Sequence, residues 1–455
     1  MSDSQRSDVT TYATDPPMHD GLPVIGNTHQ LVREQEGLYE TAARHGDVVH
    51  LRLLGIGDFY QVNQPELVER ILVDDRDRFR KASLSQEDLG DLLGQGLVLS
   101  EGELWERQRE RIQPAFYMDR IADYAGTMTT EVRTAADDWT GRPTVNVENE
   151  MKALTLRILV KSMFGSDIDY GARGIRETVR ALQEPGQPAK QPIARMVPKW
   201  VPIPMWRRYK QGIREMESVI QEFVAARREG SVEERDDLLS MLLTATDEEG
   251  EEMSGKLLRD ELMTFLFAGH ETTATALTFT WFLLAQHPEV ERRLVAELDD
   301  VLAADHATFE DLPELEYTEQ VLREAMRLYP PVPSIPRETT QALELGGYAL
   351  PAGATVAPMQ WTIHRDERFW REPLTFRPER FAGEEDRPQF VYFPFGGGPR
   401  RCIGQQFAIV EGKLILATLA RQYRLELVSD PDVDLSVSIT TRPLDPIRMH
   451  VEPRE

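Results

Sequence analysis

The chain is poor in cysteine and in lysine. Its 455 residues include one cysteine, Cys402, and only eight lysines among 52 basic residues. A single cysteine excludes an internal disulfide and a zinc site made of several cysteines, so Cys402 is idle, reactive or a lone metal ligand. Acidic residues number 77, and the formal charge is -25 at pH 7. This charge argues against nucleic acid as a partner, because phosphate binding requires clustered Lys and Arg.

Long apolar runs are also absent from the sequence. A membrane-spanning helix needs about 20 consecutive apolar residues, but the most apolar stretch, 262–285, contains Gly269, His270 and Glu271. That stretch therefore predicts a buried helix. Residues 1–21 lack the basic-then-apolar order of a signal peptide. We expect a soluble cytoplasmic protein, whose acidity indicates either an ordinary acidic protein or adaptation to high salt, where carboxylates keep the surface hydrated.

Helical periodicity dominates the chain. It covers residues 31–43, 64–74, 103–113, 119–138, 149–164, 206–229, 257–286, 288–303, 315–328 and 403–421. Short extended runs lie at 48–54, 59–62 and 348–362. Residues 1–20 have the composition of a flexible polar tail, and no linker interrupts residues 21–455. The sequence therefore predicts one domain that is mainly α with a minor β part.

Cys402 lies in a glycine-rich loop. Residues Phe395 to Gly404 read Phe-Gly-Gly-Gly-Pro-Arg-Arg-Cys-Ile-Gly and precede an amphipathic helical pattern. Glycines let backbone N–H groups approach the sulfur, and these donors and the helix dipole favour a thiolate, the form that ligates metal. Lone cysteines are usually small buried hydrophobes, but the glycines and arginines here argue against that interpretation. A phosphate loop is excluded because its lysine and its leading apolar strand are absent.

These residues resemble the haem-binding signature of the cytochrome P-450 superfamily, Phe-x-x-Gly-x-Arg-x-Cys-x-Gly. Every fixed position is matched: Phe395, Gly398, Arg400, Cys402 and Gly404. The resemblance implies a single P-450 domain that binds haem b with Cys402 as the iron ligand. It also implies a haem-thiolate monooxygenase that consumes O2.

An acid and an alcohol stand side by side in the longest helical pattern, in Ala268-Gly269-His270-Glu271-Thr272-Thr273. A glycine followed by hydroxyl side chains weakens a helix locally. A zinc-hydrolase motif is broken here, because residue 274 is alanine where a second histidine is needed. By resemblance, Glu271 and Thr272 deliver protons during oxygen activation, Ala268 faces the cofactor, and His270 is a substrate-side or packing residue. The alternative for Glu271 is a buried polar group satisfied by its neighbours.

Two further motifs extend the resemblance. Glu324 and Arg327 are three residues apart on one predicted helix face, where most such pairs are surface salt bridges. They match the family's Glu-x-x-Arg motif, which implies a structural ion network completed by Arg380. Haem propionates need cationic or hydrogen-bonding partners, and the resemblance assigns this role to four residues: Trp105, Arg109, Arg337 and Arg400.

The sequence specifies the substrate and the electron donor less closely than the cofactor. By resemblance, an apolar, lipid-like substrate (fatty acid, terpenoid or carotenoid) contacts residues 89–104, 170–215, 265–268, the segment after Pro331, and Ile439 with Thr440. The wording of two motifs is slightly closer to fatty-acid hydroxylases. We expect a monomer without a fused reductase. Electrons would come from NAD(P)H through a reductase and a ferredoxin or flavodoxin-type donor, docked on a basic patch: Arg107, Arg109, Arg111, Arg400 and Arg401.

Two alternatives stay open. A peroxide-driven oxygenase or isomerase on the same scaffold would not need the dioxygen proton relay, so the intact Glu271–Thr272 pair argues against it. A haem-thiolate sensor would need Cys402 but neither the acid nor the alcohol.

Overall fold

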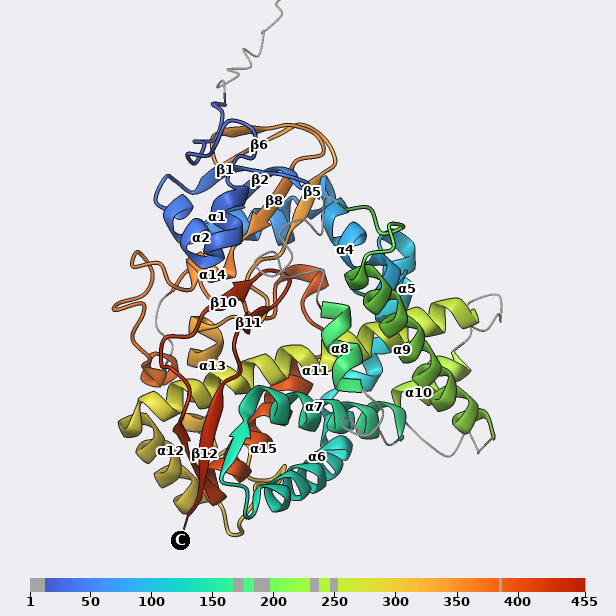
Figure 1. Ribbon diagram of the computed structural model, residues 1–455, viewed down its shortest axis with the longest axis vertical. Coiled ribbons are helices and arrows are strands. Elements are labelled where there is room, and N and C mark those ends of the chain that lie inside the picture. Colours follow the sequence, from blue (N-terminus) through green and yellow to red (C-terminus); the bar gives the residue numbers. More distant parts are fainter. Residues whose placement is uncertain are drawn as a thin grey trace, which may run out of the picture.

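Helices surround one long central helix, α11 (Gly255–Gln286), which crosses the middle of the molecule (Figure 1). The computed structural model describes residues 13–166, 175–183, 197–229, 237–245, 253–383 and 387–454. Helix α11 begins at a serine cap, where the Ser254 hydroxyl accepts a hydrogen bond from the Leu257 N–H at 3.2 Å. Its residues are buried on nearly every side, as expected of a helix that is apolar around most of its circumference.

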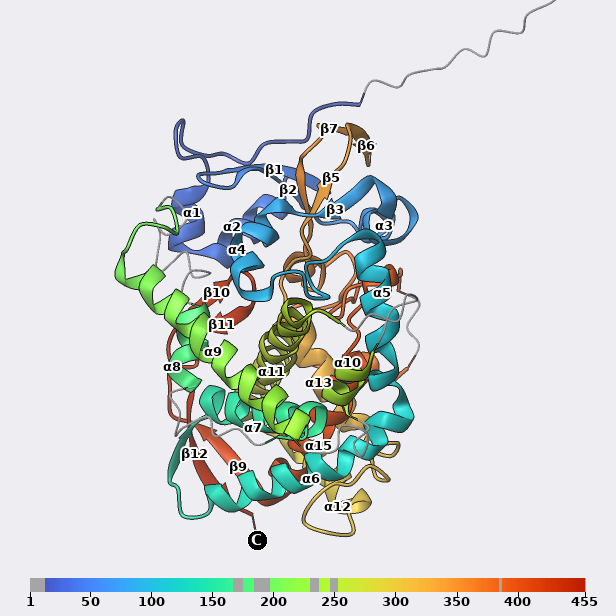
Figure 2. The same cartoon turned by 90° about the vertical axis from the view of Figure 1, so that its right-hand side faces the viewer.

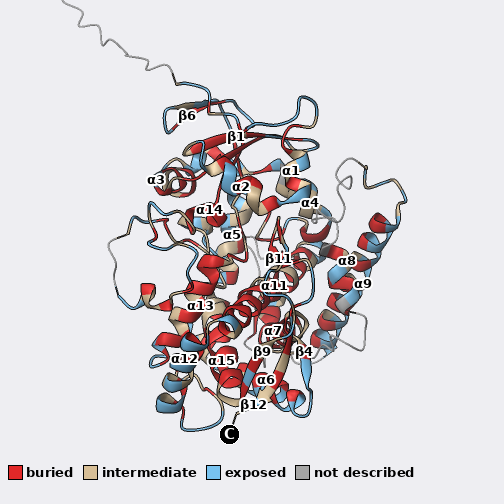
Figure 3. Ribbon diagram, turned by 60° about the vertical axis from the view of Figure 1, so that its left-hand side comes forward, coloured by how far each residue is buried: buried red, intermediate tan, exposed pale blue. Residues whose placement is uncertain are grey.

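The larger helices that pack around α11 come from both halves of the chain (Figure 2). Those in contact with α11 are α7 (Val147–Phe164), α9 (Pro204–Glu229), α12 (Pro288–Val301), α13 (Glu316–Leu328) and α15 (Gln405–Gln422). Helix α6 (Met118–Trp139) packs on α7 and α15. The shorter ones are α1 (Thr28–Arg33), α2 (Gln35–Ala43), α3 (Pro65–Glu69), α4 (Ser83–Leu93), α5 (Gly102–Ile112), α8 (Ile175–Gln183), α10 (Leu238–Thr244) and α14 (Gln360–Ile363). Buried surfaces converge on α11 and α7, whereas α9 and α12 expose one face (Figure 3).

A five-stranded sheet lies at the end of the molecule that holds α1 and α2 (Figure 1). Its order is β1-β2-β8-β5-β3, and only the β2–β8 pair is parallel. These strands are β1 (Val48–Leu53), β2 (Gly57–Val62), β3 (Phe79–Lys81), β5 (Arg337–Thr339) and β8 (Thr355–Pro358). Strands β3 and β5 matter for function because they bring Lys81 opposite Arg337 in register.

Three smaller sheets complete the fold. Their orders are β4-β12-β9, β10-β11 and β6-β7, all antiparallel. The strands are β4 (Thr144–Asn146), β6 (Leu343–Leu345), β7 (Tyr348–Leu350), β9 (Tyr423–Leu427), β10 (Leu435–Val437), β11 (Thr441–Pro443) and β12 (Arg448–Pro453). The turn between β10 and β11 reaches the middle of α11, where Thr440 contacts Glu271.

The prediction of a mainly α domain with a minor β part is confirmed, and most predicted helices begin and end within a few residues of the observed ones. Three details are wrong. The predicted helix at 31–43 is divided at Glu34, whose backbone is extended. Residues 360–363 form α14, not a strand. Helices α4, α8 and α10 were not predicted.

The second part of the predicted flexible tail over residues 1–20 makes backbone hydrogen bonds to neighbouring segments. The Thr14 N–H donates to the Gly347 carbonyl at 3.1 Å, and the His19 N–H donates to the His50 carbonyl at 3.1 Å. The backbone of this segment is therefore fixed against the strands, and residues 1–12 lie outside the described residues. Across the described parts of the chain, no helix has the length and apolarity that a membrane span requires.

Candidate active site

A cavity of about 310 Å³ lies between α11 and the loop that precedes α15. Its walls are mostly apolar and come from segments far apart in sequence. The predicted site residues in its lining are Trp105, Arg109, Ala268, Thr272, Arg337, Phe395, Arg400, Cys402 and Gly404. The fold thus brings the cysteine loop, one turn of α11 and the predicted propionate-binding residues around a single space.

The cysteine loop is held by its own backbone. The Cys402 N–H donates to the Phe395 carbonyl at 2.9 Å, and the Arg401 N–H donates to the Gly398 carbonyl at 3.1 Å. Gly398 has φ +64°, and a Cβ there would lie 2.2 Å from the Leu72 carbonyl oxygen. Glycine is therefore required at this position, both for its backbone conformation and for the close approach of a neighbouring segment. Helix α15 begins directly after this loop, at Gln405.

The Cys402 side chain is surrounded by protein yet accessible, because it faces the cavity. Burial raises the pKa of its thiol, whereas a hydrogen bond from the Gly404 backbone and the charges of Arg109 and Arg401 lower it. Burial has the largest effect, so the net direction is a raised pKa, while the backbone donor and the two arginines act in the direction that favours a thiolate. A coordinated metal ion would supply the missing stabilisation, because metal binding deprotonates a thiol.

Positive charge gathers at one side of the cavity. Arg337 is 8% exposed, and burial together with Arg400 lowers its pKa to about 10. Burial, Arg337 and Arg400 also lower the pKa of Lys81, and Glu101 opposes them. The Arg400 guanidinium lies 4.4 Å from the centre of the Trp105 ring and donates to the Ser100 carbonyl at 2.9 Å. Cations packed together and depressed in pKa indicate a place for anionic groups.

Lys81 is the site residue that sequence reasoning missed. It lines the same cavity and pairs in register with Arg337 across β3 and β5. Its only sequence signal is that lysine is rare in this chain. The pairing of two short strands, more than 250 residues apart along the chain, decides its position.

The residues present fit haem. The cavity has a thiol on one wall, apolar side walls and a partly buried cluster of cations at its edge. These features match a flat apolar group with an iron centre and two carboxylates. Cys402 would hold the iron, and Arg109, Arg337, Arg400, Lys81 and Trp105 would hold the propionates. When bound, haem supplies the activation of dioxygen.

Thr272 faces the cavity from α11. Its hydroxyl donates to the Ala268 carbonyl at 3.0 Å, one turn earlier in the helix. At Gly269 a Cβ would lie 3.0 Å from Leu159 of α7, so glycine permits the close packing of the two helices. Helix α11 runs without interruption through this turn. The hydroxyl beside the cavity can therefore exchange its helix hydrogen bond for one to a bound molecule or water.

Glu271 points away from Thr272 although the two are neighbours in sequence. It is 1% exposed, and its Oε1 accepts a hydrogen bond from the Thr440 hydroxyl at 3.2 Å. The same oxygen lies 3.7 Å from Nε of Arg442, which is also buried. Successive residues of a helix are rotated by about 100°, so the acid and the alcohol cannot face the same side. Arg442 is a second residue that sequence reasoning missed.

His270 packs between α11 and α7. Its Nδ1 lies 2.5 Å from the Leu266 carbonyl oxygen, and its own carbonyl accepts a hydrogen bond from the Thr155 hydroxyl at 3.0 Å. Burial lowers the pKa of His270 to about 4, against the opposing effect of Glu271. The neutral ring is therefore a packing group in this structure.

Glu324, Arg327 and Arg380 lie together in a fully buried ion network. Arg327 contacts Glu324 at 2.7 and 2.8 Å, and Nε of Arg380 lies 3.0 Å from Glu324 Oε1. Arg327 also donates to the carbonyls of His364 and Pro373 at 2.6 and 2.7 Å. The network therefore links α13 to the segments that lead toward the cysteine loop.

Comparisons with known proteins agree with this geometry. Residues 16–447 match the family described as cytochrome P-450, and the chain belongs to that family. It is 34% identical to cyclooctatin synthase of Streptomyces melanosporofaciens over 449 residues, 95% of each chain. It is also 34% identical to cyclooctat-9-en-7-ol 5-monooxygenase of the same organism over 90% of this chain and 88% of that one. Pentalenene oxygenase of Streptomyces avermitilis is 30% identical over 90% and 91%. The protein is thus a P-450 monooxygenase.

Proposed function

We propose that this monooxygenase hydroxylates a C–H bond of a terpenoid. The reaction consumes O2, two electrons and two protons, and it places one oxygen atom in the substrate and releases the other as water. The bacterial relatives that oxidise terpenoids support this substrate class over fatty acids and carotenoids, and one of them is named for an alcohol substrate. The mostly apolar cavity beside Cys402 suits a hydrocarbon skeleton.

The observation that carries this proposal is the shared cavity of Cys402 and Thr272. Cys402 would ligate the iron of haem b, and the Thr272 hydroxyl would hold a proton donor or water next to the site of oxygen activation. Glu271 would supply protons from the far side of the same helical turn, which requires it to leave Thr440 and Arg442. General acid catalysis of this kind requires a positioned donor with access to a proton source.

Electrons would come from NAD(P)H through a reductase and a ferredoxin or flavodoxin-type protein. Arg107 and Arg401 are exposed near the cysteine loop, and Arg401 Nε donates to the Gln405 side chain at 2.6 Å. Glu103 lies 3.8 Å from Arg107, so acidic residues are interspersed with the basic ones. Positive charge here would still speed the encounter with an acidic donor, as charge complementarity acts mainly on association.

The first test is the absorption spectrum of the reduced holoprotein under carbon monoxide. We expect the strongly red-shifted Soret band of thiolate-ligated haem in the wild type and its loss in Cys402→Ala. A wild-type protein without this band would refute the assignment of Cys402.

The second test separates the oxygenase from the peroxide-driven alternative. We expect terpenoid hydroxylation with O2, NAD(P)H, ferredoxin and reductase. Turnover with hydrogen peroxide alone, equal in rate to that with the redox partners, would favour the alternative. A holoprotein that shows no spectral response to any terpenoid and no turnover of one would instead favour a sensor.

A further inference from the structure

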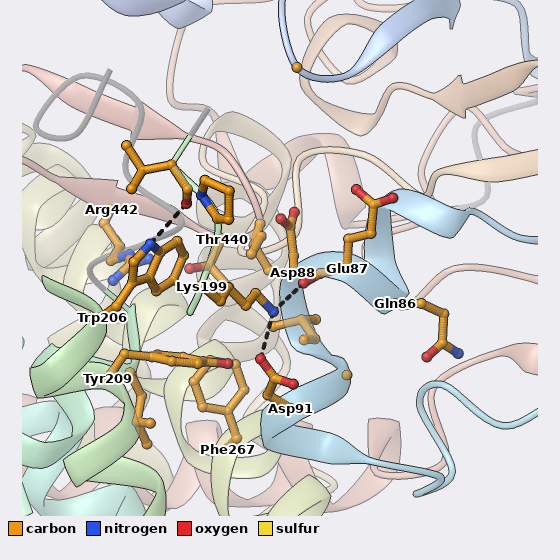
Figure 4. A pocket seen from close by; sticks show the side chains of 17 residues that line it. Gln86, Glu87, Asp88, Asp91, Lys199, Trp206, Tyr209, Phe267, Thr440 and Arg442 are labelled. Atoms are coloured by element: carbon orange, nitrogen blue, oxygen red, sulfur yellow. Dashed lines mark hydrogen bonds and ion pairs between the residues drawn. The ribbon is translucent and has the colours of Figure 1, made fainter. Parts of the chain in front are cut away.

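A second pocket of about 410 Å³, here called the outer pocket, lies between α4, α9, α11 and the turn that joins β10 to β11 (Figure 4). Aromatic rings of Trp206, Tyr209 and Phe267 line one side of it. Phe267 lies on the same turn of α11 as Phe265 and Ala268, which line the cavity beside Cys402. One helical turn spans about 5.4 Å. The outer pocket and the cavity beside Cys402 therefore border the same turn of α11.

The Tyr209 hydroxyl is a buried donor without a hydrogen-bond partner among the described residues. The residue is 2% exposed, and its ring lies beside Phe267 with the hydroxyl directed into the outer pocket (Figure 4). Burial together with Asp91 and Asp88 raises the pKa of Tyr209, so the hydroxyl keeps its proton. A buried polar group without a partner is costly. An oxygen atom of a ligand would remove that cost.

The charges around the outer pocket select among oxygen-bearing ligands. Carboxylates of α4 line one side: Glu87, Asp88 and Asp91. Lys199 donates to the Asp91 carboxylate at 2.8 Å and to the Glu87 carbonyl at 2.5 Å. Arg442 faces Glu271 at 3.7 Å. Both cations of the described lining, Lys199 and Arg442, thus already face carboxylates, which disfavours a carboxylate ligand and favours a neutral hydroxyl.

We propose that the outer pocket binds the hydroxyl group of a terpenoid alcohol, which accepts a hydrogen bond from Tyr209 while its hydrocarbon part extends along α11 toward Cys402. This inference rests on the proposed function and narrows its substrate. The substrate then reaches the enzyme already hydroxylated, from a reaction that adds water or oxygen to the terpene. A fatty acid would place its carboxylate among the acids of α4.

The test measures binding to the holoenzyme through the spectral shift of the haem iron. The probes are two matched sets of equal carbon number: farnesene, farnesol and farnesoic acid, and their twenty-carbon counterparts. In at least one set the alcohol should bind roughly two- to tenfold more tightly than the hydrocarbon, which is the value of one hydrogen bond. The acid should bind more weakly than the alcohol.

Variants test whether Tyr209 causes the preference for the alcohol over the hydrocarbon. Tyr209→Phe keeps the ring and its packing on Trp206, 5.9 Å away, and should reduce the affinity for the alcohol to that for the hydrocarbon, whose own affinity stays constant. Tyr423→Phe is the matched control, since its hydroxyl donates to the Ala136 carbonyl at 2.8 Å in the structural core. It should leave the affinity ratio unchanged. The double variant Glu87→Gln with Asp91→Asn should raise the affinity for the acid.

The outcomes distinguish this inference from the function on which it depends. If the hydrocarbons shift the spectrum and the alcohols bind no better in either set, or if the acids bind most tightly, the inference is refuted and the terpenoid function stands. An unchanged preference for the alcohol in Tyr209→Phe also refutes it. If no probe of either set shifts the spectrum of a protein that forms the carbon monoxide band, the terpenoid function fails, and the inference fails with it.

Discussion

Two buried glutamate–arginine pairs, one on α13 and one between α11 and β11, differ in how tightly they are held. Glu324 and Arg327 on α13 are both fully buried and make two hydrogen bonds at 2.7 and 2.8 Å, with Arg380 as a third member at 3.0 Å. Glu271 of α11 and Arg442 of β11 are nearly as buried, but their atoms are 3.7 Å apart. The first pair has the geometry of a bidentate bond, and the second does not.

The two geometries indicate which pair stabilises the fold and which pair can rearrange. A buried pair repays its loss of hydration only with good geometry and additional hydrogen bonds, and the Glu324 network has both. Its bonds to the His364 and Pro373 carbonyls immobilise the segments near the cysteine loop. The contact between Glu271 and Arg442 is longer, so less interaction energy is lost when the Glu271 carboxylate moves. A group that transfers protons must be able to move in this way.

Replacing Glu324 by glutamine should have the largest effect. Glu324→Gln leaves two buried guanidinium groups without their carboxylate and should lower the free energy of unfolding by about 3–5 kcal/mol. Chemical denaturation measures this quantity. Glu103→Gln is the control, because Glu103 pairs with Arg107 at 3.8 Å on the surface and should cost less than about 1 kcal/mol. Equal losses in the two variants would show that the network is not structural.

The pH dependence of the free energy of unfolding should reveal that His270 is buried as a neutral ring. Its pKa of about 4 lies below the value of about 6.5 expected in the unfolded chain. The unfolded chain therefore takes up the proton first as the pH falls, and stability is lost between about pH 6.5 and pH 4, by about 3 kcal/mol. His270→Gln should flatten this part of the curve, whereas His29→Gln at an exposed position should not. A slope that His270→Gln leaves unaltered would contradict a buried neutral ring.

Glu271→Gln should separate chemistry from stability. We expect turnover to fall about a hundredfold, because a general acid of this kind contributes 10²–10⁴-fold, and we expect released peroxide to rise. The amide can still accept the Thr440 hydrogen bond, so the free energy of unfolding should fall by less than about 2 kcal/mol. A loss of stability as large as that in Glu324→Gln, with normal turnover, would reverse the comparison of the two pairs.

The smallest effect should be at the surface near the cysteine loop. Arg107→Glu should slow reduction by a ferredoxin about tenfold at low salt, and the difference should shrink as salt is added. Arg33→Glu, an exposed change of the same charge on α1, is the control and should have little effect. Indifference of the reduction rate to Arg107→Glu would refute docking at this face.

Much of the site follows from local sequence. The spacing of Phe395, Gly398, Arg400, Cys402 and Gly404 specifies a loop whose bonds close within ten residues, and Glu324 and Arg327 are neighbours on one helical turn. Such contacts are set by backbone geometry alone, so a pattern read along the chain predicts them. The mostly apolar stretch 262–285 in α11 likewise predicts a buried helix in any compact arrangement.

Other features were decided only by the tertiary structure. The sequence places Glu271 beside Thr272, yet the acid faces Thr440, 169 residues away, and the alcohol faces the cavity. Lys81 enters the site through a strand pairing with Arg337, and the Tyr209 hydroxyl faces the outer pocket because α9 packs against α11.

The fold class, the family resemblance and the cysteine loop could therefore be predicted from local patterns in the sequence, which depend on contacts within a few turns of chain. Packing between distant segments decides three other features: the direction of the Glu271 side chain, the place of Lys81 among the cations, and the position of the Tyr209 hydroxyl in the outer pocket. The physical reason is that a side chain on a helix can point in any direction around its axis, and only the neighbours that the fold supplies select one of them.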